Sequence, residues 1–170
     1  MKKQLVLNLE NEKIEGNVLD AGFVNYGIPY LIYKHNVKEF DIEYAEREKM
    51  KEQPLKSEYD SGVLFFTFRD MLFNFNKKRL IKSMYRYLNN NGIIYIWDAS
   101  KGTFKIEDLE VKVLLPENKS KNIFIKDYNV FKNNSKEKIL NMVSEYFNVV
   151  TFKTYEDIFF IKGIKKGVKR

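Results

Sequence analysis

Three short apolar runs constrain the fold most, because each is too continuous for a strand with one side in solvent. They are Val18-Leu19, Val63-Leu64-Phe65-Phe66 and the segment 93–97. Strands that are apolar on both faces are typical of parallel sheets covered on both sides. The chain is therefore expected to build a central, largely parallel sheet whose first strand ends at Asp20.

Helical patterns alternate with these runs. A short helix is expected over 29–34, since Pro29 suits the first turn of a helix. A second is expected over 43–51, which is rich in Glu, Lys, Ala and Met. A third follows Asn76, with Leu80, Met84 and Leu88 on one face. Strand and helix in alternation indicate a doubly wound α/β sheet.

The last third of the chain adds further strands. A hairpin is expected from 147–152 and 158–164 around the turn residues 154–157, which places an antiparallel strand near the C-terminus. Asn134 and Glu137 form a possible capping box for the helix before it. The 170 residues suit one domain, 1–170, with a doubly wound, mostly parallel open sheet. Other expected strands are 17–19, 37–40, 62–68, 93–97, 109–115 and 122–126.

Composition excludes several kinds of chemistry. The chain has no cysteine, which rules out disulfides and thiolate ligands, and its one histidine, His35, leaves little material for a metal site or a Ser-His-Asp triad. The segment 1–13 alternates polar and apolar residues, unlike a signal peptide. No stretch approaches the roughly 20 apolar residues of a membrane span. We expect a soluble, cytoplasmic protein without metal or membrane partner.

The chain carries a formal net charge of +7, with 30 basic and 23 acidic residues. The lysines are scattered along the whole length, which favours a simply solvated surface over a binding stripe. Attraction to nucleic acid remains a possible but less favoured interpretation.

Acidic residues recur where the expected strands end. Asp20 follows the expected strand 17–19, Asp41 follows 37–40 and Asp98 follows 93–97. Carboxyl ends of parallel strands border the ligand crevice of such sheets. Asp41 lies 19 residues after Gly22, close to the spacing of about 20 at which a second-strand acid meets a ribose. These acids are candidates for ligand contacts, although each could also be a turn residue.

From about Gly16 to Lys166, an ordered set of motifs resembles class I S-adenosylmethionine-dependent methyltransferases. The segment 17–22 (NVLDAG) resembles the first-strand motif of the family, and 40–43 (FDIE) resembles the second. The segment 59–66 is similar to the fourth-strand motif, and 88–96 to the turn into the fifth strand. The terminal strand pair is matched by 146–150 and 158–166.

This resemblance implies S-adenosylmethionine as cofactor and methyl transfer as the reaction. Asp20 and Gly22 would lie near the methionine end, Asp41 would bind the ribose, and Glu43 is its nearest substitute. The acceptor, small molecule or macromolecule, is not identified, and no catalytic residue is assigned, since orientation provides most of the acceleration in methyl transfer. The cofactor-binding residues implied by the resemblance are Asp20, Gly22, Gly27, Asp41, Glu43, Phe66 and Thr67.

Two departures from the family pattern favour an alternative. Val24 and Tyr26 stand where glycines are usual, and only 16 residues separate Glu43 from Asp60, too few for a third strand and its helices. The alternative is a degenerate domain without cofactor binding that acts as an interaction or regulatory module. The shortened edge predicts a possible homodimer. A nicotinamide oxidoreductase is disfavoured, because Gly22 and Gly27 do not form Gly-x-Gly-x-x-Gly.

Overall fold

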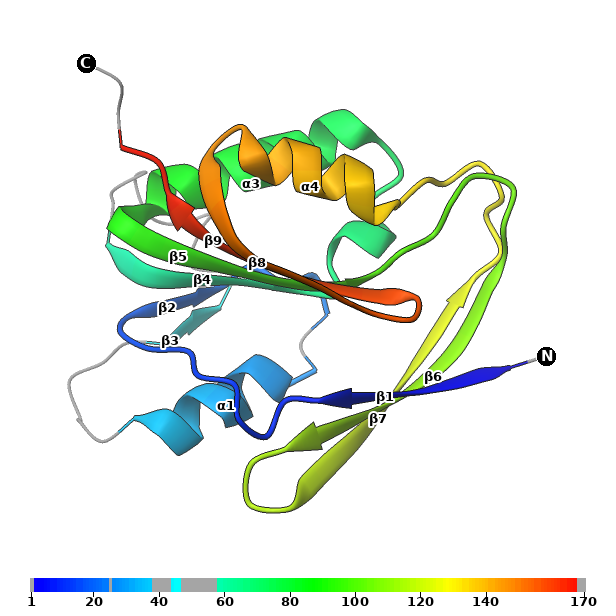
Figure 1. The fold of residues 1–170 in the computed structure, drawn as a ribbon, viewed down its shortest axis with the longest axis horizontal. Coiled ribbons are helices and arrows are strands. Elements are labelled where there is room, and N and C mark those ends of the chain that lie inside the picture. Colours follow the sequence, from blue (N-terminus) through cyan, green and yellow to red (C-terminus); the bar gives the residue numbers. More distant parts are fainter. Residues whose placement is uncertain (1, 25, 38–43, 47–57, 168–170) are drawn as a thin grey trace.

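The apolar runs form the centre of a six-stranded sheet in a computed structural model that describes residues 2–24, 26–37, 44–46 and 58–167. The strand order is β3-β2-β4-β5-β9-β8, and β9 runs opposite to the other five (Figure 1). The mostly parallel sheet with an antiparallel strand near the C-terminus is confirmed. The strands are β2 (Val18–Asp20), β3 (Tyr44–Glu46), β4 (Tyr59–Phe65), β5 (Leu88–Ala99), β8 (Phe147–Tyr155) and β9 (Ile158–Lys165).

Helices α3 (Asn74–Tyr87) and α4 (Lys136–Ser144) cover one face of this sheet (Figure 1). Their apolar sides pack on alternate residues of the central strands, which point toward them because side chains of a strand alternate between its faces. This layer of the core contains Leu64, Ile81, Met84, Ile94, Ile96, Ile139 and Val143, all buried.

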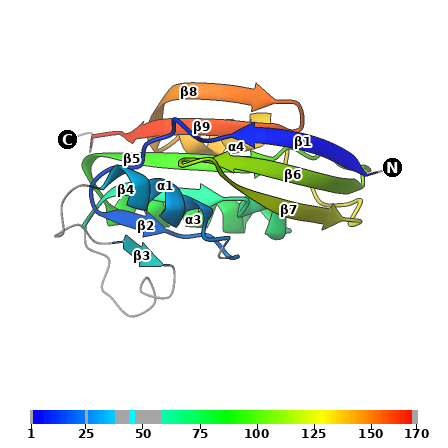
Figure 2. The ribbon, with the colours of Figure 1, turned by 90° about the horizontal axis from the view of Figure 1, so that it is seen from below.

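The opposite face is covered by α1 (Ile28–Asn36) together with a second, three-stranded sheet (Figure 2). That sheet consists of β1 (Lys3–Asn8), β6 (Glu107–Leu115) and β7 (Lys119–Asp127) in the order β1-β6-β7. β1 is parallel to β6, and β7 is antiparallel to it. Its inward side chains, such as Leu7 and Val111, join Trp97 in one core cluster.

The doubly wound arrangement is therefore not confirmed in the described residues, because much of one face is covered by strands rather than helices. The physical cause is the alternation of apolar and polar residues in β1, where Leu5 and Leu7 are buried while Gln4, Val6 and Asn8 are exposed. A period of two presents an apolar face only as a strand. The six-stranded main sheet is therefore mixed. Two helices pack on one of its faces, and α1 with the three-stranded sheet packs on the other.

The helix expected over 43–51 is wrong at Tyr44–Glu46, which form β3 parallel to β2. Pairing with a buried neighbouring strand outweighs the helix preference of Ala and Glu there. The strand expected over 37–40 begins at Val37, which instead ends α1, and residues 38–43 lie outside the described residues. Residues 47–57, which connect β3 to β4 along the chain, lie outside the described residues, so the missing third strand and dimerisation along the β3 edge stay predictions.

Aromatic packing fills the centre of the molecule. The Trp97 ring stacks on the Phe160 ring, with centroids 4.6 Å apart and an angle of 19° between the ring planes. Tyr95 stacks on Trp97 with a centroid distance of 6.1 Å and an interplanar angle of 10°. These residues lie on neighbouring strands β5 and β9, where cross-strand ring pairs stabilise the sheet. Among the helices described, none has the length and apolar character needed to cross a membrane.

Because the small sheet shares the core with the main sheet, Leu7→Ala is expected to destabilise the whole chain. Leu7 is fully buried, and removing such a leucine typically costs about 2–5 kcal/mol. Val6→Ala on the same strand is the matched control, since Val6 is 61% exposed. Urea denaturation should show a single transition that shifts only for Leu7→Ala. A separate early transition for the small sheet would contradict one common core.

Candidate functional site

The carboxyl ends of β2 and β4 bring three of the predicted cofactor residues together. Asp20 ends β2, and its Oδ1 accepts the N–H of Gly22 at 3.1 Å. A Cβ atom at Gly22 would lie 3.2 Å from Asp20 Oδ1 and 3.8 Å from Thr67 Oγ1. A side chain at position 22 would therefore be tight against Asp20 and in ordinary contact with Thr67. Asp41 and Glu43, the predicted ribose contacts, lie outside the described residues.

The backbone turns sharply where β4 ends. Phe66 has a φ of 48°, a left-handed conformation that is rare for a bulky residue and often found at functional turns. Its N–H donates to Trp97 O at 2.7 Å, and its buried ring packs on Phe65 and Tyr26. Thr67 is also fully buried, with Oγ1 3.3 Å from Phe65 O. Phe66 therefore directs its ring into the core, while the turn itself borders the site.

The segment after Gly22 leads into α1. Val24 is 48% exposed, whereas Tyr26 lies with its ring against Phe65 and Phe66. Burial raises the pKa of Tyr26, and the nearby Arg69 opposes that shift. Gly27 has a φ of 66° and is the N-cap of α1, a backbone conformation that favours glycine. Its clearest structural role is thus to start the helix.

A cavity of about 630 Å³ is lined by Phe23, the residue after Gly22, but not by Asp20, Gly22 or Thr67. Phe23, which follows Gly22, forms one side of it, and the short 3₁₀ helix η1 (Phe68–Asp70) with the first residues after it forms another. Pockets for small ligands typically occupy about 300–1,000 Å³ and combine apolar walls with a few polar groups. Besides Phe23, the cavity is lined by residues of η1, of the segment after it and of α3, namely Asp70, Met71, Leu72, Phe73, Asn76, Arg79, Leu80, Ser83 and Tyr87.

The α3 wall was not among the sequence predictions. Asn76, Arg79 and Ser83 carry the signal that was available, since they recur at spacings of three and four residues beside the apolar stripe of α3. Leu80 and Tyr87 of that stripe line the cavity as well. A polar helix face is usually just solvated, so only its place beside η1 marks it as part of a cavity.

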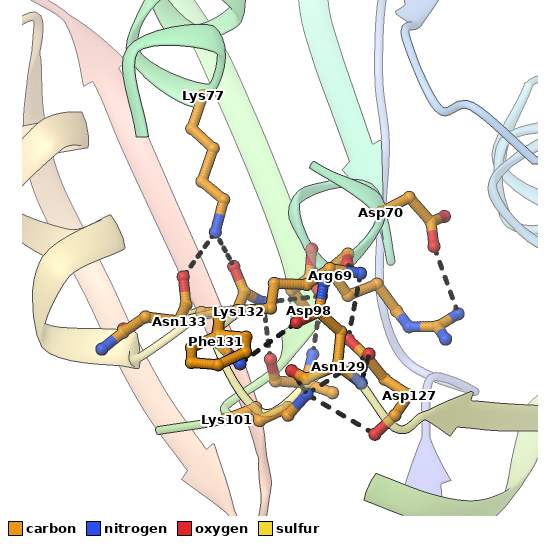
Figure 3. A network of polar contacts seen from close by, with 12 residues as sticks. Arg69, Asp70, Lys77, Asp98, Lys101, Asp127, Asn129, Phe131, Lys132 and Asn133 are labelled. Carbon is orange, nitrogen blue, oxygen red and sulfur yellow. Dashed lines mark hydrogen bonds and ion pairs between the residues drawn. The ribbon is translucent and has the colours of Figure 1, made fainter. Parts of the chain in front are cut away.

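A fully buried carboxylate, Asp98, holds the turn after β4 in place (Figure 3). It accepts the N–H of Phe68 at 2.6 Å, the N–H of Ala99 at 2.8 Å and the amide of Asn134 at 3.2 Å. Burial raises its pKa to about 7, although these N–H groups and nearby Arg69 and Lys77 oppose the shift. The acid expected to face a ligand is instead a structural centre.

Lys77 completes this network from α3. It is fully buried, and its Nζ donates to Asn133 O at 2.8 Å and to Asn134 Oδ1 at 2.9 Å. Burial lowers its pKa to about 8. Asn134, expected as a helix cap, is drawn instead to Asp98 and to Ala99 O, and Ser135 is the N-cap of α4.

A second group of charges borders η1. Asp127 pairs with Lys101 at 3.3 Å and with Lys132 at 3.0 Å, and Lys132 Nζ also donates to Arg69 O at 2.8 Å (Figure 3). Burial alone would raise the pKa of Asp127, but the Asn129 N–H and Lys132 together lower it. These contacts tie the segment around 127–132 to η1.

Arg69 lies between these groups and the cavity. Its Nη1 forms a local ion pair with Asp70 Oδ1 at 3.8 Å, and its buried Nε has no hydrogen-bond partner in the described part of the chain. Glu107 Oε2 is likewise buried without one. Burial raises the pKa of Glu107, and Arg69 is the main group that opposes the shift.

In fold, the chain is similar to several solved structures. They include the PH0226 protein of Pyrococcus horikoshii OT3, at 12% identity and a TM-score of 0.60 over 93% of this chain and 85% of that one. An S-adenosylmethionine-dependent methyltransferase of Mesorhizobium loti matches at 8% identity and a TM-score of 0.59, over 91% of this chain and 93% of that one. The glycopeptide N-methyltransferase MtfA in complex with S-adenosylmethionine matches at 12% identity and a TM-score of 0.51, over 92% of this chain and 90% of that one.

No protein-family model and no curated protein sequence matches the chain. Identities near 10% show the fold alone. The likeness nevertheless spans nearly the whole chain in each case. The chain therefore has a methyltransferase-like α/β fold and resembles the class I S-adenosylmethionine-dependent family in its architecture.

The shifted pKa values of Asp98 and Lys77 predict how the free energy of unfolding depends on pH. Because the pKa of Asp98 rises from 3.8 to about 7 on folding, the folded state holds its proton longer than the unfolded state does. The free energy of unfolding should therefore fall as pH rises between these two values. Lys77, with a pKa lowered from 10.5 to about 8, should restore stability as pH rises above about 8.

The variant Asp98→Asn tests this assignment. Its unfolding free energy, measured in urea from about pH 5 to about pH 7.5, should depend less on pH than that of the wild type. Glu137→Gln, an exposed change on α4, is the control and should follow the wild type. An unaltered pH dependence in Asp98→Asn would show that another group titrates in this range.

Proposed function

We propose that this chain transfers a methyl group from S-adenosylmethionine to an acceptor, with the cofactor held across the carboxyl ends of β2 and β4. The observation that carries the proposal is the close placement of Asp20, Gly22 and Thr67 at the ends of two parallel strands, with Phe23, the residue after Gly22, lining the 630 Å³ cavity. The fold supports it, because in open α/β sheets ligands bind outside the carboxyl ends of the strands. The MtfA structure holds S-adenosylmethionine on the same fold.

The residues present fit such a cofactor. The absence of a side chain at Gly22 keeps the backbone open at the point where a Cβ would press on Asp20. Asp20, half-buried at the strand end, offers a carboxylate for an ammonium or hydroxyl group. Phe23, Leu72 and Phe73 offer apolar surface for a flat ring, and all three are partly exposed.

When bound, S-adenosylmethionine supplies a methyl group on a sulfonium, which is already a strong electrophile. The work of the chain is therefore to orient the reactants, which provides most of the acceleration in such reactions. Arg69 and Asp70 lie on η1, directly after the carboxyl end of β4. Their place is kept by the Phe68 N–H bond to Asp98.

A degenerate interaction module is the second candidate. Tyr26, at a position where the family pattern has glycine, packs over Phe65 and Phe66. This ring reduces the freedom of the loop after Gly22, which favours a module that keeps the scaffold without the cofactor. Cofactor binding separates the two functions.

Isothermal titration with S-adenosylhomocysteine, the demethylated product, tests the proposal. The wild type should bind saturably, and Gly22→Val should weaken binding about tenfold or more, equivalent to about 1.4 kcal/mol, because the added Cβ would lie only 3.2 Å from Asp20 Oδ1. Gly102→Ala is the control, since the nearest atom to its Cβ would be 4.0 Å away. Thermal melting should confirm that both variants fold. Absence of heat in the wild type would favour the interaction module.

A further inference from the structure

Another pocket, of about 280 Å³, lies where the ends of the two sheets meet. The main sheet contributes Ser100, directly after β5, and Asp157 in the turn between β8 and β9, and the Ser100 N–H donates to Asp157 O at 2.6 Å. The small sheet contributes Lys3 of β1 and the first residues of β6. These segments lie on the same side of the molecule (Figure 1). None of the described residues that line this pocket also lines the cavity of the candidate site.

The first residue of β6, Glu107, faces the space between the two sheets. It lies on the same side of the strand as Leu109 and Val111, which belong to the core shared by both sheets, because side chains alternate along a strand. Only 6% of Glu107 is exposed, and the residue lines the pocket. Its Oε2 is buried without a hydrogen-bond partner in the described part of the chain. The Glu107 carboxylate thus borders the pocket with one oxygen that lacks a donor.

A buried acceptor without a donor is unfavourable, since it has lost its contacts with water and gained no hydrogen bond in exchange. Native structures therefore contain few such groups. Asp108, the next residue, also lines the pocket, and its buried Oδ1 has no partner among the described residues either. Two unpartnered carboxylate oxygens at one pocket indicate a ligand that brings N–H donors.

The cations closest to Glu107 have other partners or do not reach it. Lys101 Nζ donates to Asn129 O at 2.7 Å and pairs with Asp127 at 3.3 Å. Asp127 lies opposite Glu107 in the register of β6 and β7, so it takes a cation that could otherwise pair with Glu107. Arg69 opposes the rise in the pKa of Glu107, yet in the described part of the chain no ion pair or hydrogen bond joins the two side chains.

The remaining lysines of the pocket do not serve the two acids either. Lys3 Nζ pairs with Asp157 at 2.7 Å and with Glu156 at 2.9 Å. Lys105 lines the pocket and is exposed, but within the described residues no hydrogen bond or ion pair joins it to Glu107 or Asp108. The chain itself thus leaves these two carboxylates without a donor.

We propose that this pocket binds a small molecule through a primary ammonium group, which donates to Glu107 and lies beside Asp108. An ammonium group carries three N–H donors and no acceptor, and its hydrogen bonds to carboxylates are among the stronger ones in proteins. A metal ion fits less well, because the described residues contain no group of three or more His, Cys, Asp or Glu side chains placed to hold one. The volume lies slightly below the roughly 300–1,000 Å³ of typical ligand pockets, which restricts the ligand to a small molecule.

The ammonium group can belong to an alkylamine or to a free amino acid. Lys105 is the lysine of the pocket without an ion pair among the described residues, so it is available to meet the carboxylate of an amino acid. Both sources share the interaction with Glu107 and differ only in that second contact. Binding in this pocket does not depend on the proposed methyl transfer, since it uses no residue of that site.

An NMR chemical-shift titration of the full chain with n-propylamine tests the inference. The amide signals of residues 100–109 should shift saturably in the wild type. Glu107→Gln should weaken binding about tenfold or more, because it removes the charge and keeps the shape of the side chain. Glu110→Gln on the same strand is the control, since Glu110 lies outside the pocket and already pairs with Lys2 at 2.8 Å. Equal affinity of the wild type and Glu107→Gln, or no saturable shift with propylamine or alanine, would overturn the inference.

Melting temperatures separate binding from folding. Without amine, Glu107→Gln should melt at the wild-type temperature or above it, since a buried charge without a partner is removed. Propylamine should raise the melting temperature of the wild type but not that of Glu107→Gln. Lys105→Met should melt like the wild type, and a lower value would show that Lys105 itself satisfies the two acids, which would overturn the inference. Asp108→Asn is the second binding variant, expected to lower the affinity about threefold, and it decides the question if Glu107→Gln does not fold.

Two further ligands define the group that is recognised. N-acetylalanine carries a carboxylate but no ammonium group and should not bind, and binding as tight as that of alanine would overturn the inference. Alanine that binds more tightly than propylamine, and loses this advantage in Lys105→Met, assigns the ligand to the amino acids, whereas tighter binding of propylamine assigns it to the alkylamines. These titrations contain no S-adenosylhomocysteine, so their failure would leave the proposed function untouched.

Discussion

The arrangement at the carboxyl edge of the sheet depends on the buried carboxylate of Asp98. Through the N–H of Phe68 and the amide of Asn134, it links the turn after β4 to the segment before α4, and Lys77 reaches the same segment from α3. A buried acid is tolerated only when hydrogen bonds and opposite charge compensate its loss of water. Compensation by groups from three elements fixes η1, α3 and the segment before α4 relative to one another.

The two faces of the main sheet are covered in different ways, and the candidate cavity lies beside the helical layer. Helices α3 and α4 cover one face, and the outer side of α3 forms a wall of the cavity. The small sheet and α1 cover the other face. The segment between β5 and α4 thus completes the core through β6 and β7.

Much of the fold was open to prediction because the strongest local patterns agree with the tertiary contacts. The continuous apolar runs became β2, β4 and β5, and the hairpin became β8 and β9. The expected helix at 43–51 failed at β3, where pairing with β2 prevails over composition. In the candidate site, Asp20 and Gly22 could be placed from the strand-end motif, whereas the cavity wall on α3 could not, since a polar helix face is ordinarily solvent-facing.

By itself the sequence determined the strand and helix alternation, the acid at the end of β2 and the absence of cysteine chemistry, because these follow from local patterns and composition. Only the tertiary structure decided that Asp98 is buried rather than ligand-facing, that Thr67 meets Gly22, and that residues 100–106 pair with 128–135. Each of these depends on contacts between residues far apart in the chain. No local pattern encodes such contacts, since they arise only when the packed elements bring those residues together.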